Sequence, residues 1–191
     1  LKAKDQFFDR DQTFLSVFDF FIHTLFYQRS VHSGGGSASS APGVIWCGID
    51  RTWSDEDVIE FLVHELAHNL LFLDERAYRH YVNFKSIAEK ENWAMSAVLE
   101  IHRPLDKVFH SLVVAHDVLK HRQVHGEPVS PIVHPSSDHL YDAAQKTIKS
   151  LHDVIDKKNL VVERFCVLLN MIENSLCEIK IRDFPQFSLS K

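Results

Sequence analysis

Cysteine is scarce in this sequence, and its scarcity excludes one means of stabilising a small protein. Three cysteines occur among the 191 residues, namely Cys47, Cys166 and Cys177. So few thiols, and an odd number of them, argue against the disulfide framework on which many small secreted proteins rely. We therefore expect reduced cysteines and a cytoplasmic protein.

Long apolar runs and an excess of positive charge are also missing. No hydrophobic stretch approaches the roughly 20 residues that a membrane-spanning helix needs, and the chain does not open on a signal-peptide pattern. The net charge is -5 at pH 7, which gives no electrostatic attraction to nucleic acid. We expect neither a membrane nor a nucleic acid among the partners, and the sequence leaves the oligomeric state unknown.

The residues that are abundant are those of an ordinary globular protein. Hydrophobic residues make up 45% of the chain, charged residues 25%, and phenylalanine occurs 14 times. This composition predicts a single domain over residues 1–191, mainly α with a few short β-strands and an aromatic-rich core. The spacing of apolar residues predicts helices over 13–28, 54–73, 104–120, 137–156 and 160–177, a helix or turn over 78–90, and strands over 44–47 and 94–101.

Two segments lack this periodicity and are predicted to be loops, over residues 33–40 and 121–135. The first contains three consecutive glycines flanked by serines, a composition typical of flexible segments. It is not a phosphate-binding Walker loop, because the Gly-Lys-Ser/Thr ending is missing. Three interpretations stay open for it: a mobile lid over a site, a plain connector, or an engineered linker.

The predicted helix over 54–73 carries the most informative motif of the chain. Ser54 and Asp57 have the spacing of a capping box at its start. His64 and His68 follow on one face of the helix, one turn apart, so both imidazoles can reach a single ion. Glu65, one step round the helix, can lie beside that ion without binding it. The pattern predicts a mononuclear metal-dependent enzyme.

The motif by itself leaves the third metal ligand open. In one protease class a glycine breaks the helix and a histidine six residues beyond the second ligand completes the site. Leu71 and Asp74 occupy those two positions here, and Asp74, carried on by an unbroken helix, is expected to point away from the metal. In another class a glutamate from a following helix completes the site, and Glu89 and Glu91 lie at a suitable distance in the sequence.

Two histidines of the predicted helix over 104–120 are the other candidates. His110 lies at the edge of its apolar face and His116 nearer the centre, and periodicity alone does not separate them. Asp106, one turn before His110, can accept a hydrogen bond from its ring and set its tautomer. Arg103 would stand at the mouth of this helix, where a guanidinium suits a carboxylate-bearing ligand. The plain alternative is a surface arginine that caps a turn.

Three segments of the sequence resemble the HExxH-type peptide β-hydroxylases, a family of 2-oxoglutarate-dependent iron enzymes. They are residues 39–43 before a predicted strand, residues 64–71 of the motif helix, and residues 103–110. The resemblance extends over about 39–122. It implies that His64, His68 and His110 bind Fe(II) and that Arg103 holds the carboxylate of 2-oxoglutarate. It further implies a peptide substrate that is hydroxylated at a side-chain β-carbon, with Glu65 as a neighbouring polar group.

Two other functions are compatible with the same helix. In a zinc peptidase, three protein ligands and one water bind Zn²⁺, and Glu65 acts as the catalytic general base on that water. A metal-stabilised interaction module within a larger assembly would need no catalytic group at all. Bound metal and 2-oxoglutarate in the purified protein would separate these interpretations most directly.

Overall fold

The longest helix, α3 (Asp55–Ala77), stands at the centre of the fold and carries the histidine motif. The structure is a computed structural model, and it describes residues 11–29 and 34–179. The predicted capping box is confirmed, since Ser54 accepts from the Asp57 amide and the Asp57 carboxylate accepts from the Ser54 amide, each at 3.0 Å. The helix runs four residues beyond the predicted end at Leu73, so the motif lies well inside a continuous helix.

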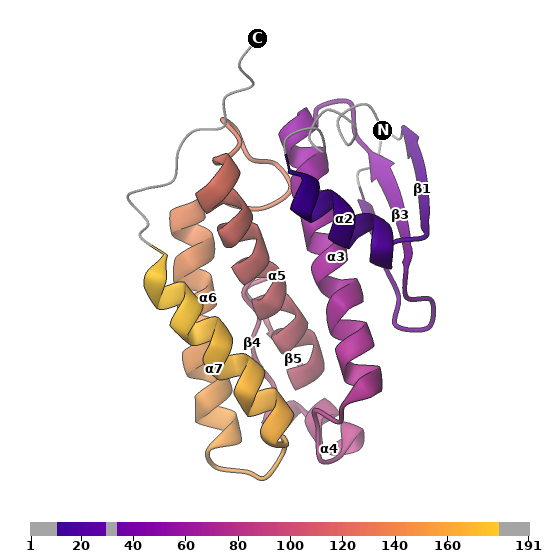
Figure 1. Cartoon of the computed structure of the whole chain (residues 1–191). Helices are drawn as coiled ribbons and strands as arrows, with labels where there is room; N and C mark the ends of the chain where they lie inside the picture. Colours follow the sequence, from indigo (N-terminus) through magenta and orange to yellow (C-terminus); the bar gives the residue numbers. More distant parts are fainter. Residues whose placement is uncertain (1–10, 30–33, 180–191) are drawn as a thin grey trace.

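Three further helices pack beside α3 and form a layer with it (Figure 1). They are α5 (Leu105–His125), α6 (Ser137–Ile155) and α7 (Glu163–Glu178). In that layer α5 contacts both α3 and α6, and α7 contacts α5 and α6. Their facing apolar side chains form the larger of two hydrophobic cores, with Phe109 and Phe165 fully buried. The prediction of a mainly helical fold with a few short strands is confirmed.

The predicted loop over 121–135 begins too early. Helix α5 continues through Arg122 to His125, and the next residue, Gly126, has a φ of 97° in the left-handed region that favours glycine. Arg122 is fully buried and ion-paired to Glu60. A helical pattern that counts only apolar residues cannot include a buried arginine, so the apolar pattern predicts a helix that ends before Arg122.

A small sheet covers the other side of α3 (Figure 1). Its strands are β1 (Thr24–Arg29), β2 (Gly34–Gly36) and β3 (Val44–Ile49), in the order β1-β3-β2. Strand β3 pairs in parallel with β1 and antiparallel with β2. The predicted strand over 44–47 is confirmed, and a second hydrophobic core lies between this strand, α3 and α2 (Gln12–Phe21).

The predicted helix over 13–28 is therefore wrong in its second half. Helix α2 ends at Phe21, and β1 begins at Thr24. The carbonyl of Gly43 accepts hydrogen bonds from the amides of His23 and Thr24, at 2.9 and 3.1 Å. The pairing with β3, which is remote in sequence, thus decides where the helix stops.

The glycine segment is not a plain loop, because Gly34–Gly36 forms strand β2. A Cβ atom added at Gly35 would lie 2.5 Å from both the Trp46 carbonyl oxygen and the Phe61 ring. The close backbone approach to β3 therefore requires glycine at this position. Residue 33 lies outside the described residues. Residues 34–36 are thus a structural part of the sheet, whereas residues 37–40 form no strand. The lid and linker interpretations stay predictions.

Between α3 and α5 the chain forms short elements only. They are α4 (Phe84–Ala88), the 3₁₀ turn η1 (Lys90–Asn92), and the two-residue strands β4 (Ala94–Met95) and β5 (His102–Arg103). The predicted strand over 94–101 is thus confined to its first two residues, and a turn joins β4 to its antiparallel partner β5. The sequence predicts Pro104 as the first residue of the following helix. In the structure it occupies the N-cap position, and α5 begins one residue later, at Leu105.

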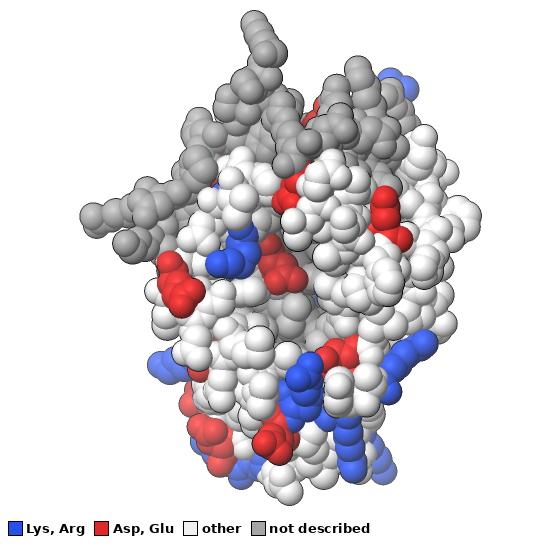
Figure 2. Space-filling view, in the orientation of Figure 1, with Lys and Arg blue, Asp and Glu red and all other residues white. Residues whose placement is uncertain are grey.

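The surface of the protein carries both basic and acidic side chains. Figure 2 shows basic and acidic side chains interspersed over one face, and the described residues of that face form no continuous basic patch.

None of the helices in the described ranges combines the length and apolar character needed to cross a bilayer. All three cysteines are free, and Cys47 is buried.

Candidate functional site

One pocket collects four of the five residues that the sequence singled out. His64, His68, Arg103 and His110 all line a pocket of about 390 Å³, where α3 faces β5 and the first turns of α5. The remaining lining residues are Ser37, Phe72, Val98, Leu99, Lys107, Ser111 and Val114. Glu65, the fifth predicted residue, does not line the pocket.

Four imidazole rings form a continuous series of short contacts through this site. His134 Nε2 lies 2.7 Å from His64 Nδ1, His64 Nε2 lies 3.1 Å from His68 Nε2, and His68 Nδ1 lies 2.9 Å from His110 Nδ1. Each of the two inner rings uses both nitrogens in this series. The rings come from α3, α5 and the loop before α6, so the tertiary fold assembles a row that no local sequence window contains.

A carboxylate closes the row at each end. Glu60 Oε1 lies 2.7 Å from His134 Nδ1, and Glu75 Oε2 lies 3.3 Å from His110 Nε2. An ionised carboxylate only accepts hydrogen bonds, and a neutral imidazole donates one. The row therefore has five contacts but only four protons when every ring is neutral. In that state one of the five contacts lacks a proton.

Burial keeps the two motif histidines neutral. Burial is the main cause that lowers the pKa of His64 well below its usual value, with contributions from His134 and His68. The pKa of His68 falls to about 3 through burial and then through the nearby charges of His110, Lys107 and Arg103. The neutral imidazole is the form that binds metal ions, so both rings are poised as ligands.

The two histidines of the motif direct nitrogens to a shared point, as their spacing predicts. His64 Nε2 and His68 Nε2 face each other, whereas His110 contacts the opposite nitrogen of His68. His110 is thus part of the cluster but is placed one ring further along. Among the residues that the structure describes, no three His, Cys, Asp or Glu side chains converge with metal spacing. The role of His110 as third ligand stays a prediction.

The predicted partner of His110 is wrong. The ring contacts Glu75 Oε2 at 3.3 Å, whereas Asp106 forms an ion pair with Lys107 at 3.3 Å. Asp106 lies one helical turn before His110 in the sequence, but Glu75 reaches the ring from the neighbouring helix α3. The directions of the side chains across the α3–α5 interface determine which carboxylate contacts His110. The sequence alone does not give these directions.

The competing third ligands lie elsewhere. His116 contacts Asp117 and the Ser175 hydroxyl, on a different groove of the surface. Asp74 pairs with His80 and Arg164, so it points away from the site as expected. Both glutamates near η1 are exposed, and one of them, Glu91, pairs with Lys158.

Glu65 lies behind the pocket and is almost fully buried. Its Oε2 atom accepts a 2.7 Å hydrogen bond from the Ser37 hydroxyl, and its Oε1 atom lies 3.8 Å from His64 Nε2. Burial raises the pKa of this carboxyl to about 7, and the hydrogen bond from Ser37 offsets part of that rise. The residue is positioned beside the histidines, and its protonation changes close to neutral pH.

Four residues of this site were missed by sequence reasoning: Glu60, Glu75, Arg122 and His134. For two of them a signal existed, because Glu60 precedes His64 by four residues and Glu75 follows His68 by seven. Residues at these spacings share a helix face, so the two carboxylates could have been placed on the face of the motif. His134 follows a loop of irregular sequence, and nothing local distinguishes it from the other twelve histidines of the chain.

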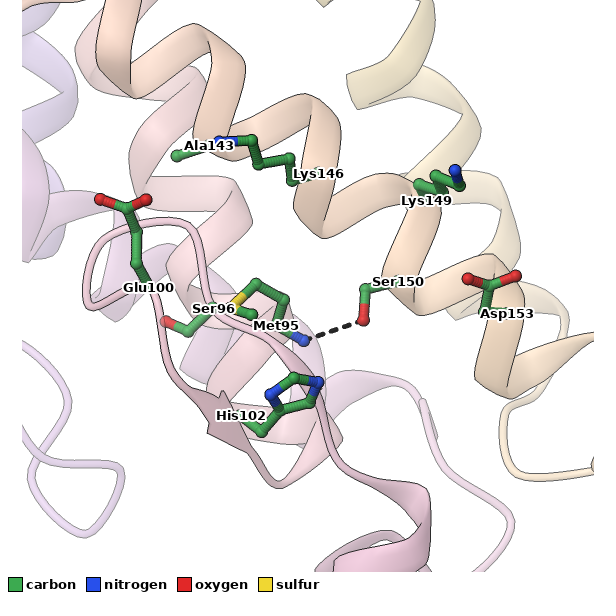
Figure 3. A pocket seen from close by; sticks show the side chains of 9 residues that line it. All are labelled: Met95, Ser96, Glu100, His102, Ala143, Lys146, Lys149, Ser150 and Asp153. Carbon is green, nitrogen blue, oxygen red and sulfur yellow. Dashed lines mark hydrogen bonds between the residues drawn. The ribbon is translucent and has the colours of Figure 1, made fainter.

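A second pocket lies on the far side of the β4–β5 segment (Figure 3). Its volume is about 360 Å³, and Figure 3 shows Lys146 and Lys149 projecting from α6 on one side and His102 on the other. The Met95 amide donates to the Ser150 hydroxyl across it, at 3.0 Å. Consecutive residues of β5 thus serve different pockets, since His102 faces this one and Arg103 faces the histidine row.

The partly buried His121, at the last turns of α5, is expected to make the protein sensitive to acid. Desolvation by burial, and then the nearby His125, lower its pKa from 6.5 to about 4. The unfolded chain binds the proton more tightly, so the free energy of unfolding decreases as the pH falls from 6.5 towards 4. We expect a loss of about 2 kcal/mol between about pH 7 and about pH 5.

Urea unfolding of the chelator-treated protein at both pH values measures this loss. A His121→Gln variant is the control, because it removes the titrating ring and should show a smaller decrease than the wild type. An equal decrease in both proteins would contradict the assignment to His121.

Comparison with known proteins adds no relative from which function could be transferred. No protein-family model matches the chain, and no curated protein matches it either. The interpretation of the site therefore depends on its own residues and geometry.

Proposed function

We propose that this protein is an Fe(II)- and 2-oxoglutarate-dependent oxygenase that hydroxylates a peptide side chain at its β-carbon. The observation that carries the proposal is the composition of one pocket. Its wall combines the motif pair His64 and His68 with His110 and with two cationic side chains, Arg103 and Lys107. The histidines suit iron, and the cations suit a dicarboxylate that binds beside it.

When all four rings are neutral, one contact of the imidazole row lacks a proton. This shortage supports a cation between His64 and His68. An ionised carboxylate can only accept, so each end contact needs a proton from its ring; the Glu60 contact is short, at 2.7 Å, and the Glu75 contact is longer, at 3.3 Å. Among the three contacts between rings, that of the motif pair is the longest, at 3.1 Å against 2.7 and 2.9 Å. Both of its rings line the pocket, as do both rings of the His68–His110 contact.

Without a proton, two nitrogen lone pairs would face each other at this contact. An added proton would have to charge a ring whose pKa burial has already lowered. A metal ion satisfies both lone pairs without charging either ring. Two cis nitrogens about 2.1 Å from an octahedral ion lie about 3.0 Å apart, and in tetrahedral geometry about 3.4 Å. The separation of 3.1 Å fits this requirement.

The cationic wall of the pocket supports an anionic cosubstrate. Arg103 and Lys107 both contribute to the lowered pKa of His68, so their charges act on the histidine row. An arginine can hold a carboxylate through two parallel hydrogen bonds, and a lysine adds a second positive charge. These two residues would bind and orient 2-oxoglutarate, while Phe72 and Leu99 provide apolar surface in the same wall.

When bound, iron and 2-oxoglutarate would supply the oxidation: O₂, a substrate C–H bond and the 2-oxo acid give the alcohol, succinate and CO₂. The protein residues do the remaining work. His64 and His68 would hold the metal, and Arg103 would orient the 2-oxo acid. His110 is the third ligand that the resemblance implies, although its ring contacts the opposite nitrogen of His68 in this structure. Phe61, stacked 6.5 Å from His64, and Phe72, 6.0 Å from His68, limit the access of water.

A zinc peptidase is the second candidate, and one observation favours it. Glu65 has a pKa of about 7, the range that suits a general base at neutral pH, and lies 3.8 Å from His64 Nε2. Its burial behind the pocket and its hydrogen bond to Ser37 argue for a supporting role instead. The cations beside the histidines have no necessary part in a peptidase mechanism.

Removing both motif histidines tests the metal site. We expect the double variant His64→Ala, His68→Ala to lose stoichiometric metal, because it lacks both Nε2 atoms that would bind the ion. Metal content after loading with Fe(II) without oxygen, and 2-oxoglutarate-dependent succinate release, are the measurements. His116→Ala is the matched control, since His116 lies on the same helix as His110 but outside the pocket. Full metal retention by the double variant would reject the site.

A further inference from the structure

We propose that His134 is a positioning residue: held by the buried Glu60–Arg122 pair, it fixes the tautomer of His64 so that the Nε2 lone pair faces His68. The inference deepens the proposed function by adding a supporting group to the metal site. Its first part, the tautomer of His64, concerns the metal-free protein and can be measured there. His134 lies in the loop between α5 and α6, a segment that carries no part of the histidine motif.

The three supporting residues are almost completely inaccessible to solvent. The relative exposure is 0% for Arg122, 1% for Glu60 and 3% for His134. Arg122 donates to both carboxylate oxygens of Glu60, at 2.7 Å each, and also to the carbonyl of Pro135, at 2.7 Å. The arginine therefore holds the carboxylate and the backbone next to His134 at the same time.

A second contact fixes the same loop to the start of α3. The Asp57 carboxylate accepts a hydrogen bond from the Ile132 amide at 2.9 Å, in addition to its role in the capping box. The loop is thus fastened to α3 and α5 on both sides of His134. A ring held in this way can impose a direction on its partner, because it has no freedom to turn away.

The direction of the protons follows from Glu60. Burial alone would raise the pKa of this carboxyl, but the hydrogen bonds from His134 and Arg122 hold it below its usual value. As an ionised acceptor it requires the proton of His134 on Nδ1. With one proton on each ring, His134 then accepts through Nε2, 2.7 Å from His64 Nδ1. His64 must therefore carry its proton on Nδ1, which leaves Nε2 free as a ligand.

His134 has no second function available in this arrangement. Both of its ring nitrogens are occupied, one by Glu60 and one by His64. It does not line the pocket. It therefore acts on a bound metal or substrate only through His64, as a support that orients a ligand.

Nitrogen-15 NMR of the histidine rings in metal-free protein tests the proposal directly. In the wild type we expect His64 to carry its proton on Nδ1. In His134→Phe, which keeps a ring but removes the acceptor, we expect the Nε2-protonated tautomer to become populated. In His134→Gln, whose amide can donate to Glu60 and accept from His64, we expect the wild-type tautomer to return. A His64→Gln variant assigns the signals.

Metal affinity provides a second measurement. Loss of a group that supports a metal ligand typically weakens metal binding by roughly 10- to 100-fold. We expect a decrease of that size in His134→Phe and recovery of most of the affinity in His134→Gln. Thermal unfolding and circular dichroism of each variant show whether it is folded. If His134→Phe does not fold, His134→Gln and the wild-type tautomer still decide the question.

Three results would overturn the proposal. They are an Nε2-protonated His64 in the wild type, an unchanged tautomer in folded His134→Phe, and a folded His134→Phe that binds metal as the wild type does. Failure of the proposed function is distinguishable from these, because it appears as absent 2-oxoglutarate turnover in a wild type whose His64 tautomer is as expected.

Discussion

Replacing Arg103 with alanine is expected to raise the apparent 2-oxoglutarate constant by roughly ten- to a hundredfold. The substitution removes a charge-assisted hydrogen bond worth roughly 1.5–3 kcal/mol, and each 1.4 kcal/mol corresponds to about a tenfold change in affinity. Arg103 lines the pocket of the histidine row with Lys107, and among the described residues that line this pocket it is the one arginine. Succinate release at varied 2-oxoglutarate concentration, with Fe(II), measures the effect.

His102→Ala is the matched control for this experiment. His102 is the neighbouring residue on β5, but it faces the pocket on the other side of the segment. It should leave the 2-oxoglutarate constant unchanged. If Arg103→Ala binds 2-oxoglutarate as the wild type does, or if the wild type binds none, the oxygenase assignment is wrong.

The two candidate functions predict different effects of Glu65→Gln on activity. In a peptidase this residue removes a proton from water, so turnover should fall by roughly 10²–10⁴-fold. In an oxygenase no such proton transfer is needed. Much of the activity should remain, because a glutamine can still accept the hydrogen bond that the Ser37 hydroxyl gives to Glu65. Arg103→Ala and Glu65→Gln, measured in the same assay series, therefore separate the oxygenase from the peptidase.

Replacing Arg122 with methionine is expected to destabilise the protein by about 3–5 kcal/mol, because it leaves a buried carboxylate without its counter-charge. Arg122 and Glu60 are both at most 1% exposed and share two hydrogen bonds of 2.7 Å. Urea unfolding of wild type and variant measures the loss. The second variant, Arg122→Met with Glu60→Gln, removes both charges and should recover part of it.

A loss below about 1 kcal/mol in Arg122→Met would be typical of an exposed ion pair. It would contradict the buried network that we describe. The same variant should also release the loop that carries His134, because Arg122 holds the carbonyl of Pro135. Loss of stability and loss of metal affinity are therefore expected together.

Sequence patterns were sufficient to predict the parts of this protein whose signals are local. The capping box at Ser54, the shared face of His64 and His68, and the amphipathic helices α6 and α7 depend on residues within a few turns of one another. Helical periodicity reports such contacts directly. The placement of Arg103 and His110 in one pocket was expected from a resemblance to a family, and periodicity alone left His116 as an equal alternative.

The packing of elements that are distant in sequence determines which groups complete the site. Glu75 rather than Asp106 contacts His110, and His134 contacts His64 across 70 residues of sequence. The end of α2 and the strand at Gly34–Gly36 were likewise set by pairing with β3. The physical reason is the same in each case. A buried polar atom or a strand edge takes whichever partner the packed elements bring within reach, and that partner need not be near in sequence.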